Sequence, residues 1–494
     1  MDPLGSADED TDVLGPEVKK KSTRKEGWRG GWTAAKQNSS PWLACPHPPS
    51  QPHPLSHPKA TLTLLSDDDD DDDATTTVIA AVEAAASDAG TPLPPRAADA
   101  AAAAGAGAAA EGAAAPRGPP GKLYPPSERT KIAKSWNQLM RWSRKNWKAQ
   151  HGAEGRTALD AVDKVVVFGG GSFGTAMAAA LARQKPALDV VLLLRDPSLV
   201  ADINAHHVNA RYLPGAPLPH NVRATSDAGE AIGGAQYALH AVPVQHSRAF
   251  LRGVRDILPI TVPVISVSKG LEVGTGALMS DLIPDALGRK QPTAFLSGPS
   301  FAAEVMARAP TGLVAASRDK ALKREVQGLF ASPYMRVNTS SDVVGVEVCG
   351  ALKNVLAIAS GIVEGLELGM NARAALVAQG CAEIRWLAEK MGAKPATVAG
   401  LSGLGDIMLT CYGSLSRNRS VGVRLGKGER LAAILASSSQ VAEGVATAGV
   451  VVALASRYHV QLPVLTAVAQ VLAGALSPEE AVAEIMGLPQ VEER

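Results

Sequence analysis

The stretch KVVVFGGGSFGTAMAAALAR, residues 164–183, decides the fold of this chain. It begins with the β-branched run Lys164–Phe168, passes through a glycine-rich turn and ends in an alanine-rich segment of helical period, Phe173–Arg183. A second β-rich run, DVVLLL, follows at Asp189–Leu194. Strand, turn, helix and strand in this order predict the start of a parallel α/β sheet that helices cover on both faces.

The remainder of the chain divides into two kinds of pattern. Further strand-like apolar runs, separated mostly by segments of helical period, are Tyr237–Val242, Val262–Val267, Ala294–Ser297 and Gly312–Ala315. After about Val337 the strand patterns fade, and long Ala, Leu, Val and Gly segments of helical period continue almost to the end. We therefore predict a Rossmann-type doubly wound α/β domain over residues 161–337 and an all-helical domain over residues 338–494.

The N-terminal part differs in composition from these domains. It contains a Pro and His cluster at Pro46–Pro58, an aspartate run at Asp67–Asp73 and an Ala and Gly tract at Ala97–Ala115. Few large apolar side chains are present to offset the entropy of ordering, so residues 1–130 are predicted to be a disordered, low-complexity extension that could include a targeting segment. Residues 131–160 are basic and rich in tryptophan, which favours a linker or a short helix that caps the folded domain; binding to a partner is the alternative.

Composition limits the partners that this chain can have. Lys and Arg number 49 against 48 Asp and Glu, a formal net charge of +1, so overall charge does not indicate a nucleic-acid or membrane-surface partner. The four cysteines form no CxxC pair, which argues against a disulfide framework and a zinc site. The sequence contains no run of about 18 or more apolar residues, so no membrane-spanning helix is predicted. We therefore expect a small-molecule partner, no metal and no membrane span.

The glycine-rich turn predicts a dinucleotide site. Gly169 permits the tight turn, Gly171 lets the backbone approach a pyrophosphate, and Gly174 lets the helix lie close to the strand. The N–H groups and the dipole at the start of the helix then attract the diphosphate. This context indicates NAD or NADP as the cofactor.

The end of the second strand bears on which nicotinamide cofactor is used. An acid at that position would bind the ribose 2′-hydroxyl, whereas an arginine would suit a 2′-phosphate. The sequence places Arg195 and Asp196 side by side, so both NADH and NADPH remain open.

Three segments could supply the chemistry of a carbonyl reduction, which needs a proton donor and groups that orient the substrate. The motif SKGLE places Lys269 after a strand, and SGPSFA places Gly298 and Ser300 after the next one. GALKNV places Lys353 among apolar residues of a helix, where burial would lower its pKa toward a useful range. The alternative for each lysine is a solvated surface position.

A fourth segment could bind an anion. Asp406 in GLGDIMLT precedes Ser416, Arg417, Asn418 and Arg419. An arginine fork matches a phosphate in bidentate geometry, and neighbouring Ser and Asn groups can complete the shell.

In their order along the chain, GGGSFGTA, SKGLE, SGPSFA, GALKNV, GLGDIMLT and LSRNR resemble the NAD(P)-dependent glycerol-3-phosphate dehydrogenase family from about Asp163 to the C-terminus. HAVPVQ, VAEG and LPQVEER are similar to the plastid branch of plants and algae. The resemblance implies reversible reduction of dihydroxyacetone phosphate to sn-glycerol 3-phosphate, which feeds glycerolipid synthesis, and a homodimer. It favours a plastid location, with the cytoplasm as the alternative because the acidic N-terminal start is unlike a transit peptide.

The resemblance also implies roles for individual residues. Lys353 matches the proton donor and acceptor, with Lys269 and Asp406 completing the catalytic group. The positions matching substrate contacts are Lys269, Gly298, Ser300, Lys353, Asp406, Ser416, Arg417 and Asn418. The positions expected at the cofactor are Gly169, Gly171, Ser172, Phe173, Gly174, Arg195, Lys269, Ala302, Arg417, Val441 and Glu443.

Two other functions fit the same two-domain pattern. A β-hydroxyacid or sugar-acid dehydrogenase would act on carboxylates, and a panel of substrates would distinguish it. A catalytically inactive NAD(P)-binding protein would bind cofactor without reducing dihydroxyacetone phosphate. A kinase is disfavoured because no GxxxxGK[ST] motif is present.

Overall fold

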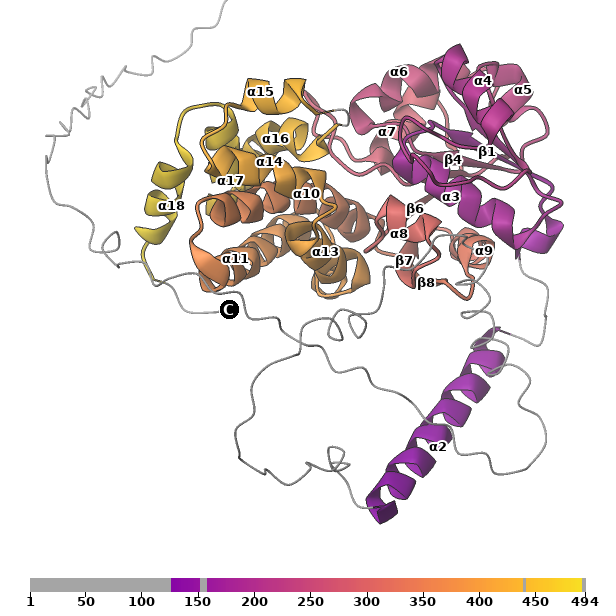
Figure 1. Cartoon of the computed structure of the whole chain (residues 1–494), viewed down its shortest axis with the longest axis horizontal. Coiled ribbons are helices and arrows are strands. Elements are labelled where there is room, and N and C mark those ends of the chain that lie inside the picture. Colours follow the sequence, from indigo (N-terminus) through magenta and orange to yellow (C-terminus); the bar gives the residue numbers. More distant parts are fainter. Residues whose placement is uncertain (1–125, 152–157, 439–440, 491–494) are drawn as a thin grey trace, which may run out of the picture. The chain divides into compact units, whose positions relative to one another are not determined.

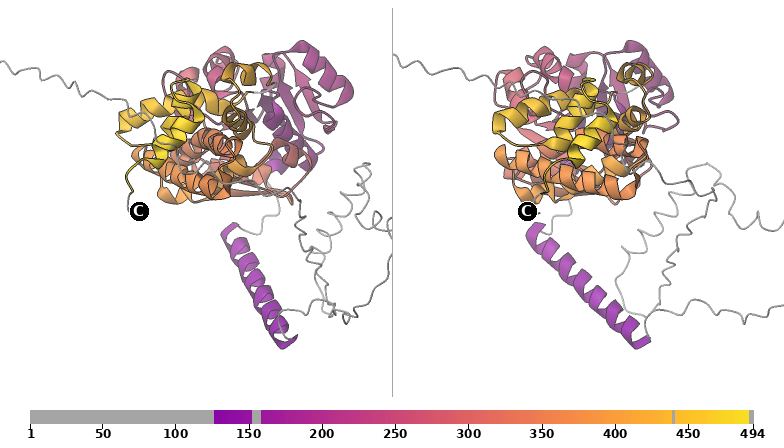
Figure 2. Two further views of the ribbon diagram at one scale, coloured as in Figure 1. Left: turned by 60° about the vertical axis from the view of Figure 1, so that its left-hand side comes forward. Right: turned by 90° about the vertical axis from the view of Figure 1, so that its left-hand side faces the viewer.

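The computed structural model describes residues 126–151, 158–438 and 441–490 (Figure 1). The predicted disordered extension over residues 1–130 lies almost entirely outside the described residues. Within the described chain, an α/β region is followed by a region built of helices, as the sequence predicts, and the two lie side by side (Figure 2).

Eight strands form one sheet in the order β3-β2-β1-β4-β5-β6-β7-β8. Their bounds are β1(Lys164–Phe168), β2(Asp189–Leu193), β3(Val222–Thr225), β4(Tyr237–His240), β5(Val264–Ser266), β6(Thr293–Ser297), β7(Thr311–Ala316) and β8(Met335–Ser340). Neighbours from β3 to β6 pair in parallel, and β1 lies beside β2 and β4. The strand order therefore reverses beside the glycine turn that follows β1, which is where open α/β sheets bind ligands.

Two features of the sheet depart from the sequence prediction. β7 pairs antiparallel with β6, and β8 runs parallel to β7, so the sheet is parallel only over its first six strands. Between β6 and β7 the chain forms only the short helix α8(Ala302–Met306) and stays at the carboxyl end of β6. It re-enters the sheet from that end, so β7 runs antiparallel to β6. The sequence analysis also missed β3 and β8, which are edge strands with polar, partly exposed positions instead of continuous apolar runs.

Helices cover the sheet and then form the second region. In the first part they are η1(Ala158–Ala161), α3(Ser172–Gln184), α4(Pro197–His206), α5(Ala228–Ile232), α6(Val244–Val254), α7(Met279–Leu287), α8 and α9(Lys320–Phe330). The second part has α10(Val343–Gly365), α11(Gly369–Lys390), α12(Pro395–Val398), the π-helical turn η2(Leu401–Gly405), α13(Asp406–Tyr412), α14(Arg417–Gly426), α15(Leu431–Ala436), α16(Glu443–Tyr458), α17(Pro463–Leu472) and α18(Pro478–Met486). A separate helix, α2(Pro126–His151), precedes both regions in the sequence.

Three groups of buried apolar residues support a division into two domains. Val165 and Val167 of β1 belong to one group, and Val166 and Phe168 belong to another, because alternate side chains point to opposite faces of a strand. The first two groups therefore lie on the two faces of one sheet and belong to one domain. The third group is built around α10 and the helices that follow it. We propose the two domains on this basis, with the boundary between β8 and α10.

Helix α10 is the centre of the helical region. It is long and apolar enough to cross a membrane by length and composition alone, but 94% of that apolar window is buried within the fold. Its position inside a folded core explains this composition.

Glycines let α14 pack directly onto α10. Gly361 and Gly365 on α10 face Gly422 and Gly426 on α14, and an added methyl group at any of the four would overlap backbone atoms of the other helix. Small residues allow two helix backbones to approach closely, and here they fix the position of α14 against α10 along most of its length.

Replacing Gly422 with Ala should therefore destabilise the protein by about 1–3 kcal/mol or more, because the methyl group would overlap the carbonyl oxygen of Ile358. Urea unfolding followed by circular dichroism measures this change. Gly449→Ala is the matched control: the site is exposed on α16 and has open space, so the change should be neutral or stabilise by up to about 1 kcal/mol. Equal stability of the two variants would contradict the proposed close packing.

Candidate active site

Two lysines and one aspartate from distant parts of the chain form a buried ionic cluster. The Lys353 Nζ lies 2.5 Å from one carboxylate oxygen of Asp406, and the Lys269 Nζ lies 2.8 Å from the other. Lys269 follows β5, Lys353 is near the middle of α10, and Asp406 begins α13. The structure therefore brings together the three residues that the sequence analysis selected as catalytic.

The charges in this cluster shift one another's protonation. Burial lowers the pKa of Lys353 to about 8; Asp406 acts to raise this pKa, and Lys269 acts to lower it further. For Asp406, burial acts to raise the pKa, but the two ammonium groups outweigh it and keep the pKa below its ordinary value. At neutral pH the cluster therefore holds the Asp406 carboxylate between two ammonium groups. The pKa of Lys353 is close enough to neutral pH for this group to exchange its proton in catalysis.

Two further groups complete the cluster, and the sequence analysis missed one of them. The Lys353 Nζ donates to the Thr410 hydroxyl at 3.0 Å, and Thr410 in turn donates to the Asp406 carbonyl at 2.7 Å. The Lys269 Nζ donates to the Gly298 carbonyl at 3.3 Å. The position of Thr410, four residues after Asp406 on one helix, was the signal that could have identified it.

Unusual backbone geometry positions two members of the site. The π-helical turn η2 comes directly before Asp406 at the start of α13. Gly298 has φ 147°, and a side chain there would meet the Gly312 carbonyl on β7, so glycine is required at this position. Ser300 donates to the Gly298 carbonyl at 3.0 Å, and Ala302 follows as the first residue of α8.

The glycine turn after β1 has the geometry that its motif predicts. Gly169 has φ 96°, and Gly174 has no room for a side chain against the Gly169 carbonyl. Gly171 faces open space, so a ligand can approach its backbone. Asn209, which the sequence analysis missed, is fully buried and donates to the Gly170 carbonyl at 2.9 Å. The turn is therefore rigid on its inner side and open on its outer side, which fits a dinucleotide diphosphate.

An aromatic ring connects this turn to the ionic cluster. The Nζ of Lys269 lies 5.9 Å from the centre of the Phe173 ring, which belongs to the first turn of α3. Ser172, beside it, donates to the Tyr212 carbonyl at 3.1 Å. A cofactor bound at the glycine turn would thus lie next to the lysines.

The neighbouring acid at the end of β2 already has partners. The Asp196 carboxylate caps α4 by accepting from the Ser198 backbone and hydroxyl, and it pairs with Arg211 at 2.9 Å. These contacts, first of all the hydrogen bonds from Ser198, lower the Asp196 pKa to about 2. Arg195 is exposed. The sequence alone could not decide whether Arg195 or Asp196 indicates the cofactor. In the structure the Asp196 carboxylate is engaged by its neighbours, whereas Arg195 is exposed.

The start of α14 is held by a hydrogen-bonded chain. The Asn418 amide donates to Asn354 on α10 at 2.9 Å and accepts from the Gly444 backbone at 3.0 Å. Ser416 is buried and caps α14 by accepting from the Arg419 backbone. Asn354, the residue after Lys353, is the third polar group that the sequence analysis missed, after Thr410 and Asn209.

The arginines in LSRNR are in different environments. Arg419 makes a bidentate ion pair with Glu364 of α10, which also pairs with the buried Arg373. Arg417 is exposed at the start of α14. Arg419 therefore anchors the helix to α10, whereas Arg417 lies at the exposed start of α14.

Two expected cofactor residues, Val441 and Glu443, lie at the start of α16. Glu443 is the first residue of α16, and burial raises its pKa to about 7, against the effects of Arg417, Lys269 and Lys353. Val441 is exposed just before it. These electrostatic effects indicate that Glu443 lies near the ionic cluster.

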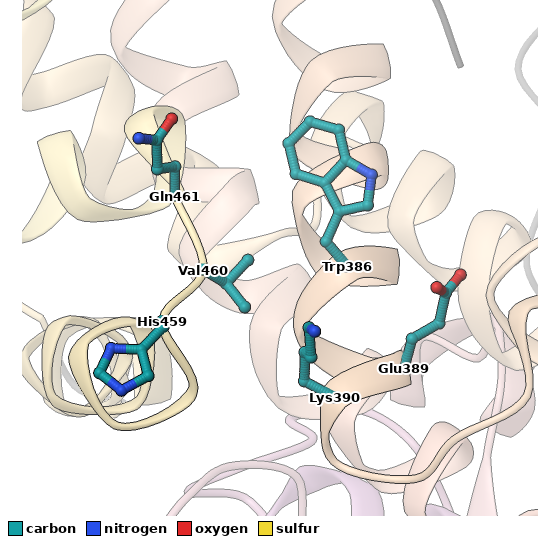
Figure 3. Close-up of a pocket in the computed structure, with 6 residues that line it drawn as sticks. All are labelled: Trp386, Glu389, Lys390, His459, Val460 and Gln461. Carbon is teal, nitrogen blue, oxygen red and sulfur yellow. The ribbon is translucent and has the colours of Figure 1, made fainter.

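A separate cavity of about 380 Å³ lies on the helical region (Figure 3). Trp386, Glu389 and Lys390 of α11 line one side, and His459, Val460 and Gln461 after α16 line the other. No residue of the ionic cluster lines this cavity. Among the described residues, no group of three or more His, Cys, Asp or Glu side chains could hold a metal ion.

Comparison with known proteins connects this geometry to one family. A family model described as the NAD-dependent glycerol-3-phosphate dehydrogenase N-terminus matches residues 164–323, and its C-terminal counterpart matches residues 342–483. Together the matches cover more than half of the chain.

Similar proteins and a similar crystal structure carry the same name. The chain is 56% identical over 363 residues to chloroplastic glycerol-3-phosphate dehydrogenase [NAD(+)] of Oryza sativa subsp. japonica, covering 73% of this chain and 82% of the relative. It is 57% identical over 379 residues to chloroplastic glycerol-3-phosphate dehydrogenase [NAD(+)] 2 of Arabidopsis thaliana, covering 76% and 89%. The crystal structure of glycerol-3-phosphate dehydrogenase from Coxiella burnetii has a TM-score of 0.64 at 34% identity, covering 66% of this chain and 99% of that one.

Replacing Asp406 with Asn should lower the pKa of Lys353 below about 8, because the two ammonium groups would then repel each other without a counter-charge. NMR titration of isotopically labelled lysine side chains measures this pKa. Asp256→Asn is the control, since that residue pairs with Arg255 on the exposed surface. A pKa for Lys353 that stays at its wild-type value or rises in Asp406→Asn would refute the coupling.

Proposed function

This chain belongs to the NAD-dependent glycerol-3-phosphate dehydrogenase family, and from this premise we propose that it reduces dihydroxyacetone phosphate to sn-glycerol 3-phosphate in a reversible reaction. As a member of the family it is an oxidoreductase that uses NAD or NADP and acts on a CH–OH group. The observation that carries the proposal is the buried Lys269–Asp406–Lys353 cluster next to the glycine turn.

Each residue of the cluster has a distinct role in the proposed reaction. The cofactor, when bound, supplies a hydride to the C2 carbonyl carbon. Lys353 donates a hydrogen bond to the carbonyl oxygen and then its proton, so that the product is an alcohol. Lys269 orients the substrate, and Asp406 holds both ammonium groups in place. In the reverse direction neutral Lys353 accepts the hydroxyl proton.

The phosphate of the substrate would be bound at the start of α14. The guanidinium of Arg417 and the amide of Asn418 can donate to its oxygens. Ser416, Gly298 and Ser300 match positions that contact the substrate in the family, and we propose them as further contacts. Gly169, Gly171, Ser172, Phe173, Gly174, Ala302, Val441 and Glu443 are proposed as cofactor contacts. The Asn354–Asn418 hydrogen bond fixes α14 relative to Lys353, so that the phosphate and the carbonyl would be held at a set separation.

We also propose a location, an oligomeric state and a metabolic role, which rest on the relatives and the family. Two relatives with the word chloroplastic in their names support a plastid location, with the cytoplasm as the alternative. Family resemblance supports a homodimer and a supply of glycerol 3-phosphate to glycerolipid synthesis.

Initial rates of NADH and NADPH oxidation test the function. Dihydroxyacetone phosphate should be reduced, and β-hydroxyacid or sugar-acid substrates should not be. Lys353→Met should reduce kcat by at least about 10²-fold while cofactor binding is retained, because the proton donor is lost. In the wild type the rate of reduction should fall as pH rises through about 8, where Lys353 loses its proton, and the rate of oxidation should rise. Wild-type turnover by Lys353→Met, or activity on carboxylates alone, would refute the proposal.

The surroundings of Arg195 favour NADPH over NADH. The Asp196 carboxylate is engaged in capping α4 and pairing with Arg211, which supports our proposal that Arg195 meets a 2′-phosphate. Arg195→Ala should weaken NADPH binding about 10–100-fold and change NADH binding little, since a charged hydrogen bond to phosphate is removed. Fluorescence titration with each cofactor measures both. Arg211→Ala is the control, because it should release Asp196 and affect NADPH less. Equal loss of both cofactors in Arg195→Ala would contradict this specificity role.

A further inference from the structure

Helix α2 exposes an apolar face that includes two tryptophans. Four large apolar side chains are more than half exposed: Ile132 at 52%, Trp136 at 59%, Leu139 at 54% and Trp142 at 62%. At about 100° per residue these four fall within an arc of roughly 120° on the helix surface. Tryptophan at such exposure is unusual in a soluble helix, because its large ring gains much from leaving water.

The opposite side of α2 is cationic. Lys134, Arg141 and Lys145 lie roughly 140–180° from Ile132, with Arg144 beside them, and Arg129 and Lys131 lie at the two borders of the apolar arc. Over residues 127–145, where the side chains are described, Glu128 is the one acid against basic residues at 129, 131, 134, 141, 144 and 145. The formal charge of the whole chain, +1, conceals this local excess of positive charge.

We propose that α2 binds an anionic lipid surface and lies in the plane of that surface. A helix with Trp, Ile and Leu on one face and Lys and Arg on the other can bury its apolar side among acyl chains while its cations meet lipid phosphates. Cations on the polar side also prevent the helix from crossing the bilayer, because their burial in hydrocarbon is costly. The inference is independent of the enzymatic function.

Separation of the two faces is what favours lipid over other anionic partners. A single-stranded nucleic acid is bound by aromatic rings and cations that converge on one surface, so that bases stack while phosphates pair. On α2 the middle of the apolar arc lies roughly opposite Lys134, Arg141 and Lys145: Trp136 is roughly 140–180° from these three cations, and Trp142, at the border of the arc, is roughly 60–100° from them. A lipid interface is layered in the same sense, with an apolar interior under a charged surface.

Vesicle sedimentation with the full chain tests the proposal. The protein should pellet with vesicles of phosphatidylcholine containing roughly 30% phosphatidylglycerol and much less with phosphatidylcholine alone, and raised salt should weaken the binding. Replacing Trp136 and Trp142 with Glu should weaken partitioning at least about tenfold, because both the apolar contact and the charge balance change. Replacing Lys134, Arg141 and Lys145 with Gln should weaken it roughly a hundredfold, or about fivefold for each cation.

A matched variant separates the effect of α2 from a general effect of charge. Ile257 and Ile260 are also exposed, at 44% and 57%, and lie outside α2. Replacing both with Glu also removes two exposed apolar side chains and adds two negative charges, but elsewhere, and should leave vesicle binding at the wild-type level. All variants should retain dehydrogenase turnover, because α2 contributes no residue to the proposed active site.

Several outcomes would overturn the proposal. These are equal binding to neutral and anionic vesicles, unchanged binding of the Trp136→Glu, Trp142→Glu variant, and binding to mixed-sequence single-stranded RNA in place of vesicles. A shift in oligomeric state in that variant, measured by light scattering, would show that the apolar face contacts a second copy instead. A loss of thermal stability in the same variant, with no vesicle binding by the wild type, would show that α2 caps the folded domain.

Discussion

One buried carboxylate, Asp406, makes the proposed chemistry possible. It is 1% exposed and carries a negative charge between the ammonium groups of Lys269 and Lys353. Without that charge, burial would further favour the neutral form of Lys353, which would face the Lys269 ammonium with no counter-charge. Because its partners come from the sheet region and from α10, the same carboxylate also joins the two parts of the fold. Stability and protonation at this site therefore depend on one residue.

Helix α10 turns this charge arrangement into a defined geometry. It carries Lys353 and Asn354, and its glycines let α14 pack at close distance. Asn418 is hydrogen-bonded to Asn354, and Glu364 pairs with Arg419, so the first turn of α14 is fixed to α10 by two polar contacts. Close packing keeps such contacts in one arrangement, because a core has few alternative packings of similar energy.

Local pattern was enough to predict most of the fold and much of the site. The β1 run and its glycine turn follow rules of local geometry, and the ordered motifs identified the lysines, Asp406 and the start of α14. Long-range contacts account for what was missed. The edge strands β3 and β8 contain Arg223 and several polar residues, so their sequences lack the apolar run by which a strand is recognised. The antiparallel direction of β7 depends on the position of α8. Asn209 supports the glycine turn from 39 positions away, which no local pattern reveals.

The distances along the chain within the ionic cluster have a consequence for biosynthesis. Lys269 and Asp406 are 137 positions apart, and Lys353 and Asp406 are 53 apart. A ribosome therefore releases both lysines before their counter-charge, and α10 emerges before the helices that enclose it. During this interval the nascent polypeptide exposes a long apolar helix that carries an unneutralised cation. Chaperone demand in translation is thus expected to concentrate between the emergence of α10 and that of α13.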